Sequence, residues 1–174
     1  NPPQRVSEMP KRKCAAHKGF LYVIDADPKI GFAKLGTGKC GTILGQTVLT
    51  SFEFVNRVPI SMAFCGDFLL IRFEDSPPTS ITIIDPSTLK VVGDVQNTEN
   101  IPAGPFAAFN DTLYVVYQRT MNSYHFDGKS LEFIKSQEIH SSSSDSEFLP
   151  ADNVKLTTLL TDGIFMNAIL TSSS

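Results

Sequence analysis

Gly66-Asp-Phe-Leu-Leu-Ile71 and Asn110-Asp-Thr-Leu-Tyr-Val115 share one layout, a turn dipeptide followed by a run of mostly apolar residues. Two further copies are Gly19-Phe-Leu-Tyr-Val23 and Thr161-Asp-Gly-Ile-Phe-Met166. Gly, Asn and Asp favour tight turns, and a short apolar run bounded by turn residues is typical of a strand buried on both faces. Each copy therefore predicts a turn that leads into a buried strand.

The copies are evenly spaced along the chain. Their central apolar residues recur at intervals of roughly 40 to 50 residues and are Leu21, Leu69, Leu113 and Ile164. A second landmark repeats with them, because Asp85 to Leu89 and Asp127 to Leu131 occupy the same place in successive units. A repeat of this length in a strand-rich sequence predicts a radial array of small sheets, the β-propeller, in which each unit buries its faces against its neighbours.

The predicted fold class is all-β, with about three and a half four-stranded propeller blades that belong to a larger closed ring. The expected repeats lie near 14–59, 60–101, 102–153 and 154–174, with a flexible leader at 1–13 and a flexible Ser-rich loop at 141–147. Closed propellers have roughly four to eight blades, so other blades of the same or another chain are expected partners. An open array with protected ends, or a β-sandwich, would also show short strands and frequent turns.

The composition is that of an ordered domain. Hydrophobic residues make up 41% of the 174 residues and charged residues 19%, which excludes the disordered class. No run of about 18 apolar residues occurs, and the net charge of -3 gives no general attraction to nucleic acid. Neither a membrane nor a nucleic acid is therefore an expected partner. The three cysteines are widely spaced and form no CxxC pair, which favours a reducing compartment, the cytoplasm or the nucleus.

One segment is close to a phosphate-binding loop, Ala33-Lys-Leu-Gly-Thr-Gly-Lys39-Cys40. Cys40 stands where such a loop has the Ser or Thr hydroxyl that binds Mg²⁺. A phosphate-binding loop also needs a helix to begin at the lysine, whereas Thr42–Leu49 is rich in β-branched residues and interrupted by Gly45. We therefore expect no nucleotide and no other cofactor.

No catalytic or metal-binding residue is predicted. The three histidines lie far apart in sequence and no Gly-x-Ser-x-Gly motif occurs. His125 lies between the aromatic residues Tyr124 and Phe126, a polar residue between apolar ones, which predicts a half-buried histidine in a strand. Seven aspartates adjoin predicted turns, where capping of backbone N–H groups would explain them: Asp25, Asp27, Asp67, Asp85, Asp111, Asp127 and Asp162.

One segment is similar to blade sequences of very large ubiquitin ligases of the HECT and Highwire-like types. It is Phe32-Ala-Lys-Leu-Gly-Thr-Gly-Lys-Cys-Gly-Thr-Ile-Leu-Gly45, preceded by Phe20-Leu-Tyr-Val23. The repeat as a whole resembles divergent propellers of the WD40, kelch and RCC1-like kind. It departs from them, because the Gly-His and Trp-Asp landmarks of WD40 repeats and the double glycine of kelch repeats are missing. The resemblance implies a substrate-recruiting or scaffolding region of such a ligase.

Propellers bind partners where the loops between their strands converge. The expected function is accordingly that of a non-catalytic protein-protein interaction platform, with proteins or peptides as partners. Exposed loop residues that we expect to contact a partner are Glu74, Asp75 and Arg119. The alternative is a propeller enzyme or a small-ligand-binding propeller with its site in the central channel.

Replacing the lysine of the phosphate-loop-like segment tests the rejection of nucleotide binding. We expect Lys39→Ala to leave the melting temperature nearly unchanged, because a turn lysine contributes little to stability. The measurement is a thermal melt of both proteins with and without ATP. An ATP-dependent rise of the melting temperature that the variant loses would overturn the interpretation.

Overall fold

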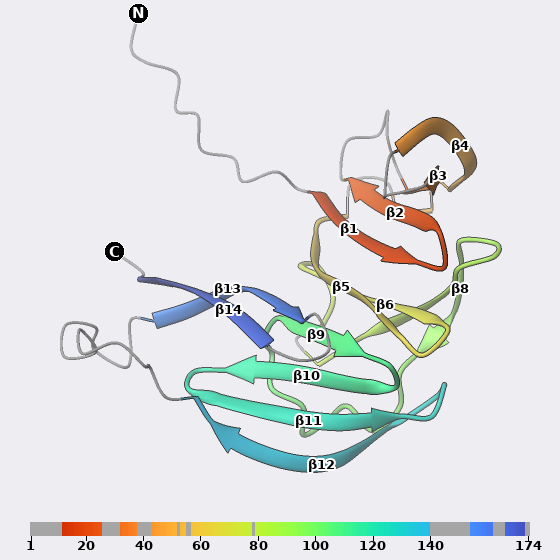
Figure 1. Ribbon diagram of the computed structural model, residues 1–174. Helices are drawn as coiled ribbons and strands as arrows, with labels where there is room; N and C mark the ends of the chain where they lie inside the picture. The colour runs from red at the N-terminus through yellow and green to blue at the C-terminus, as the bar shows by residue number, and fades with distance from the viewer. Residues whose placement is uncertain are drawn as a thin grey trace, which may run out of the picture.

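The computed structural model of the chain describes residues 12–25, 32–37, 43–51, 53–54, 57–77, 79–139, 154–161 and 166–172 (Figure 1). Over these ranges the chain forms strands and turns and no helix. The described residues therefore contain no helix that could cross a membrane. The strands are β1 (Arg12–His17), β2 (Phe20–Asp25), β3 (Phe32–Thr37), β4 (Ile43–Ser51), β5 (Pro59–Cys65), β6 (Phe68–Phe73), β7 (Thr82–Asp85), β8 (Lys90–Asp94), β9 (Phe106–Phe109), β10 (Thr112–Tyr117), β11 (Thr120–Phe126), β12 (Leu131–Glu138), β13 (Val154–Thr161) and β14 (Met166–Ser172).

The strands form three antiparallel four-stranded sheets and one hairpin. We call β1 to β4 sheet 1, β5 to β8 sheet 2 and β9 to β12 sheet 3, and in each the strands are hydrogen-bonded in sequence order. β13 and β14 pair with each other as the hairpin. The all-β class and the four-stranded units are confirmed. The described strands form no closed ring, so the propeller architecture stays a prediction.

The sequence repeat marks the same position in each sheet. Leu21, Leu69 and Leu113 are each the second residue of the second strand. A two-residue turn precedes each of these second strands. The first residue of each turn has a positive φ, and these residues are Lys18 (47°), Gly66 (61°) and Asn110 (53°). Such turns match the right-handed twist of the paired strands, which explains why Gly and Asn recur in the motif.

The first strands begin close to the predicted repeat boundaries, with β5 starting at Pro59 and β13 at Val154. Each sheet has a strand before the motif, and β1 begins at Arg12, inside the predicted leader. The fourth copy is centred on Ile164, which lies outside the described residues together with the Ser-rich segment 141–147.

The core lies between the sheets. One cluster joins Tyr22, Ile24 and Phe32 of sheet 1 to the Leu69 side of sheet 2. A second cluster joins the Leu70 side of sheet 2 to sheet 3, where Leu113 and Val115 are fully buried. Successive strand residues point to opposite faces. Sheet 2 is therefore apolar on both faces and is covered on both.

The first strands of successive units lie side by side, since β1 contacts β5, β5 contacts β9, and β9 contacts β13. Figure 1 shows the same progression from red through yellow and green to blue. A polar link joins sheet 2 to the connection that leads into sheet 3. Arg72 is buried and donates to the carbonyl oxygen of Pro102 at 3.5 Å and to that of Gly104. The units are thus held in a regular order by apolar and polar contacts.

The second sequence landmark forms capped turns between the third and fourth strands of sheets 2 and 3. The Asp85 carboxylate accepts hydrogen bonds from the Ser87 N–H at 2.8 Å and from the Ser87 hydroxyl at 2.7 Å. The Asp127 carboxylate accepts from the Lys129 N–H at 2.8 Å and from the Ser130 N–H at 2.7 Å. These hydrogen bonds lower the pKa of both aspartates, because they favour the ionised form. The capping interpretation is confirmed for these two residues.

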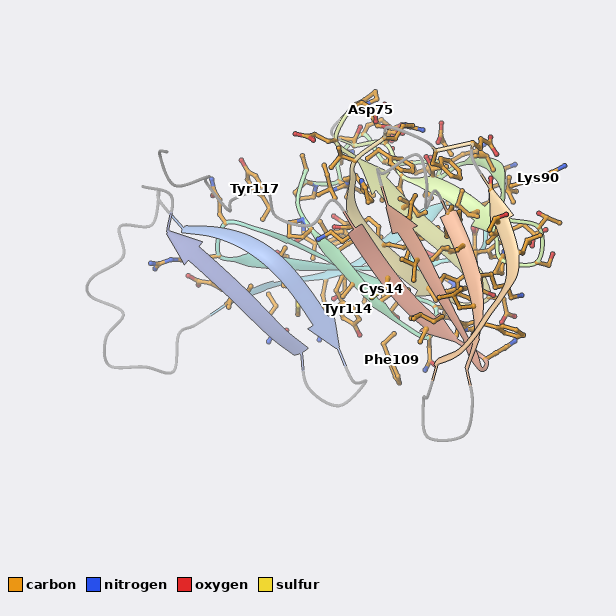
Figure 2. All side chains as sticks on the ribbon, turned by 90° about the horizontal axis from the view of Figure 1, so that it is seen from above. Cys14, Asp75, Lys90, Phe109, Tyr114 and Tyr117 are labelled. Carbon is orange, nitrogen blue, oxygen red and sulfur yellow. The ribbon has the colours of Figure 1, made fainter. Side chains whose placement is uncertain are left out.

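Truncating the motif leucine of sheet 3 tests the repeat. Leu113→Ala should lower the free energy of unfolding by about 2 to 5 kcal/mol, because the residue is fully buried between sheets 2 and 3. Urea unfolding followed by circular dichroism measures the change. Tyr117→Ala is the matched control, since that side chain ends the same strand and is 49% exposed (Figure 2). Equal stability of Leu113→Ala and the native chain would contradict the position of this strand.

The capped turns predict a loss of stability in acid. The folded pKa of Asp127 lies below its ordinary value of 3.8, so its contribution is present above that value and disappears as the pH falls through the lowered pKa. We expect Asp127→Asn to flatten the decline of melting temperature between about pH 5 and pH 2. The control is Glu99→Gln, at an exposed loop position. Identical acid profiles for Asp127→Asn and the native chain would rule the turn out as a contributor.

Candidate functional site

The turns between the first and second strands of sheets 2 and 3 meet the end of β1 around one pocket. This turn pocket has a volume of about 530 Å³ and is lined by His17, Phe64, Gly66, Asp67, Asn110 and Asp111. The Gly66 N–H donates a hydrogen bond to the Asn110 carbonyl, which joins the turn of sheet 2 to that of sheet 3. All three sheets therefore contribute to one site, at the end where the turns after their first strands lie.

Stacked rings and an ion pair form the wall between sheets 1 and 2. The His17 ring stacks on Phe64 with 4.3 Å between ring centroids and 9° between planes. Lys18 Nζ donates to the Asp67 carboxylate at 2.7 Å, and His17 Nε2 lies 3.4 Å from the same oxygen. A residue from the first turn of sheet 1 and one from the first turn of sheet 2 are thus paired directly.

The contacts of Asp67 favour its ionised form. The hydrogen bond and positive charge of Lys18, followed by the hydrogen bond of His17, lower the pKa of Asp67. The Asp67 side chain is 74% exposed and that of Lys18 is 70% exposed. Water screens such a pair, so it orients the carboxylate at the pocket more than it stabilises the fold.

A second pair lies on the sheet 3 side. Asp111 Oδ2 is 3.3 Å from His125 Nδ1, with side-chain exposures of 57% and 42%. His125 is half-buried, as predicted, and it also lines a smaller cavity of about 260 Å³ with Asn97, Asp127, Ser130, Leu131 and Glu132. The capping interpretation of Asp67 and Asp111 needs correction, since their carboxylates contact basic side chains. The Asp25 side chain, Asp27 and Asp162 lie outside what the structure describes.

Cys65 follows Phe64 at the end of β5 and is fully buried. Burial, and secondly the negative charge of Asp111, raises the pKa of the Cys65 thiol to about 12. A thiolate is the nucleophilic form of cysteine, so Cys65 is inert at neutral pH. Within the described ranges no group of three His, Cys, Asp or Glu residues could hold a metal ion. The turn pocket offers carboxylates, ring faces and backbone groups to a ligand.

The sequence-predicted loop residues lie at the other end of the sheets. Glu74 and Asp75 follow β6, and Arg119 lies in the turn between β10 and β11, so both loops join second to third strands. The turn pocket is at the opposite end of those second strands. The prediction that these three residues contact a partner stays a prediction.

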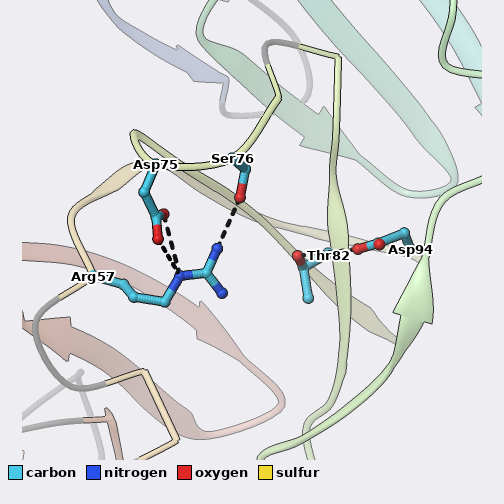
Figure 3. A network of polar contacts seen from close by, with 5 residues as sticks. All are labelled: Arg57, Asp75, Ser76, Thr82 and Asp94. Carbon is cyan, nitrogen blue, oxygen red and sulfur yellow. Dashed lines mark hydrogen bonds and ion pairs between the residues drawn. The ribbon is translucent and has the colours of Figure 1, made fainter.

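One of these residues has a partner within the chain (Figure 3). The Asp75 carboxylate accepts from Arg57 Nε at 3.0 and 3.2 Å, while Arg57 Nη2 donates to the Ser76 hydroxyl at 2.8 Å. The Arg57 guanidinium also lies 4.0 Å from the centroid of the Phe73 ring. Asp75 therefore anchors the connection between sheets 1 and 2, and any external ligand would compete with Arg57 for it.

The structure bears on the phosphate-loop-like segment as well. Phe32–Thr37 is strand β3, and the chain resumes as strand β4 at Ile43, where a phosphate-binding loop would need a helix. Lys39 and Cys40 lie outside the described residues. The expected strand-to-strand connection is confirmed by the pairing of β3 with β4.

Sequence reasoning named neither Lys18 nor any pocket-lining residue as a site residue, and it assigned Asp67 and Asp111 only to turn capping. These residues come from first strands or the turns that follow them, and their juxtaposition depends on how one sheet lies against the next. The available signal was the turn dipeptide itself, whose copies at Lys18-Gly19, Gly66-Asp67 and Asn110-Asp111 all lie at the same end.

Comparison with models of known protein families gives no match for this chain, and comparison with curated protein sequences gives none either. The function proposed below therefore depends on the geometry of the turn pocket.

Proposed function

We propose that this chain is a propeller-type, non-catalytic platform for protein-protein interaction, and that the turn pocket receives a side chain of a protein or peptide partner. The observation that carries the proposal is the assembly of one pocket from three successive sheets. Its turns are short and extend from paired strands, so the recognition groups are held in place before a partner arrives.

The exposure of the walls favours a macromolecular partner over a small molecule. Small-molecule sites are concave, mostly apolar, and bury about 70 to 90% of the ligand surface. In the turn pocket the two carboxylate side chains, Asp67 and Asp111, are themselves 74% and 57% exposed. A protein partner would add surrounding surface that excludes water from these contacts.

The chemistry of the pocket favours a basic side chain. Asp67 and Asp111 present carboxylates, and His17 and Phe64 present a pair of stacked rings. A guanidinium can form bidentate hydrogen bonds with a carboxylate and lie against an aromatic face. An arginine of the partner would compete with Lys18 for Asp67, an exposed pair that water already screens.

The wider setting follows from the sequence resemblance. In a large ubiquitin ligase, a platform of this kind would recruit substrates in the cytoplasm or the nucleus. The order of the first strands, with β1 beside β5, β5 beside β9 and β9 beside β13, supports a radial array.

A second candidate function is a propeller that binds a small ligand, or an enzyme, with its site in the central channel. The volume of about 530 Å³ favours it, because ligand pockets commonly measure about 300 to 1,000 Å³. The exposed polar walls favour the interaction platform.

A peptide-binding measurement separates the two. We expect the folded chain to bind Arg-rich peptides in preference to Glu-rich peptides of equal length in fluorescence polarisation, with affinity that falls as salt rises. Asp67→Asn and Asp111→Asn should each weaken binding about tenfold, since a hydrogen bond to a charged group contributes about 1.5 to 3 kcal/mol.

The matched control is Asp75→Asn, which removes an ion-paired aspartate at the opposite end of the sheets. Its affinity for the peptides should equal that of the native chain. Loss of binding in Asp75→Asn with full binding in the two pocket variants would move the interface to the loop end. Equal binding of acidic and basic peptides would refute the assignment to the pocket carboxylates. Turnover or binding of a small molecule without peptide binding would favour the second candidate.

A further inference from the structure

Each carboxylate of the turn pocket lies beside a histidine ring. His17 Nε2 is 3.4 Å from Asp67 Oδ1, and His125 Nδ1 is 3.3 Å from Asp111 Oδ2. The chain has three histidines, so two of the three meet the carboxylates of a single pocket, one from sheet 1 and one from sheet 3. Histidine is the side chain whose charge ordinarily changes between about pH 5 and pH 8. The charge at this pocket therefore depends on pH within the physiological range.

In the described part of the chain, the charged groups beside His17 are Asp67 and Lys18. Lys18 Nζ is 2.7 Å from the same Asp67 oxygen that His17 approaches. The neighbouring strands contribute aromatic rings, since Phe20 is the cross-strand partner of His17 on β2 and the His17 ring stacks on Phe64 of β5. β5 has no charged residue over its whole length. A proton on His17 therefore places a second positive charge at Asp67, next to that of Lys18.

The charged groups around His125 are carboxylates. Asp111 lies in the turn before β10, and Glu132 is the cross-strand partner of His125 on β12. Asp127 lines the cavity of about 260 Å³ that His125 also lines, whereas Lys129 of the same turn is not part of that wall. The neighbouring strand β10 has no charged residue. A proton on His125 therefore introduces a positive charge among carboxylates.

The carboxylates keep their charge over the range in which histidine titrates. The hydrogen bond from Lys18 lowers the pKa of Asp67 below its ordinary value of 3.8, and the Ser130 N–H does the same for Asp127. Carboxyl groups in general titrate near pH 4. At pH 8 two carboxylates, those of Asp67 and Asp111, outnumber the single lysine that contacts them. Protonation of both histidines reverses this balance, so the net charge at the pocket changes from negative to positive.

We propose that protonation of His17 and His125 closes the turn pocket to basic partners, which bind at neutral pH and dissociate in mild acid. This regulation rests on the function proposed above. A protonated ring donates a charge-assisted hydrogen bond to its aspartate, and such bonds are about twice as strong as neutral ones. The guanidinium of a partner would have to displace two imidazolium groups and enter a pocket with excess positive charge, and like charges disfavour that encounter.

Peptide binding over a range of pH tests the inference. The probe is an Arg-rich peptide with blocked termini and no other ionisable side chain. Fluorescence polarisation measures its affinity between about pH 8 and pH 5.5 at constant ionic strength. We expect the affinity of the native chain to fall at least about tenfold, because both histidines change charge in this interval. Circular dichroism at each pH shows whether the sheets are retained.

Glutamine variants assign the fall to the two rings. Glutamine has an amide that can donate a hydrogen bond, but it does not titrate. His17→Gln and His125→Gln should each reduce the ratio of the affinities at the two ends of the pH range, and the double variant should make the two affinities nearly equal. The matched control is Asp75→Asn, because Asp75 is paired with Arg57 and arginine keeps its charge in this interval. Its ratio should equal that of the native chain.

The outcomes separate this regulation from the binding function. Equal affinity of the native chain at both ends of the pH range would overturn the regulation and leave the proposed function intact. A fall of native size in both folded single variants would do the same, and so would a fall that coincides with loss of the sheets in circular dichroism. Absence of basic-peptide binding at about pH 8 would refute the proposed function itself, and the regulation with it.

Discussion

The structure depends on sheet 2 being buried on both faces. Leu69 and Leu70 are adjacent in β6 and both are fully buried, although alternation along a strand points them in opposite directions. One strand therefore contributes to two hydrophobic clusters at once, one with sheet 1 and one with sheet 3. Neither neighbour can be removed without exposing one of these faces. The sheets consequently stabilise one another as nearest neighbours, as units of a repeat protein do.

The features that the sequence alone could predict are those that depend on residues close together in the chain. The turn dipeptides and the apolar runs of second strands are local patterns, and the all-β class and the four-stranded units followed from them correctly. The capped turns at Asp85 and Asp127 were also predictable, because each carboxylate bonds to backbone groups two or three residues away. A short sequence separation leaves few alternative partners for such a side chain.

The candidate site was less accessible to prediction, because its contacts join different sheets. Asp67 looks like a turn-capping aspartate in sequence, yet its carboxylate bonds to Lys18, 49 positions earlier. His17 stacks on Phe64 only because β1 lies beside β5. The turn motif specified where each hairpin reverses. The way one sheet lies against the next decided which turn residues meet, and that depends on the apolar side chains between the sheets.

Arg72 shows how polar groups fix that arrangement. It shares a face of β6 with Leu70, toward sheet 3, and burial alone lowers the pKa of its guanidinium to about 10. Its donors to the carbonyls of Pro102 and Gly104 hold the connection that carries the chain from sheet 2 to sheet 3. The same guanidinium lies 5.7 Å from the ring of Phe106, where β9 begins. Apolar burial has no preferred direction, whereas hydrogen bonds to two carbonyls do. Two further directional contacts join sheets 2 and 3, since the Phe106 N–H donates to the Ser61 hydroxyl at 3.3 Å and the Gly66 N–H donates to the Asn110 carbonyl at the pocket. The apolar clusters hold the sheets together, and these hydrogen bonds add the direction that apolar burial lacks.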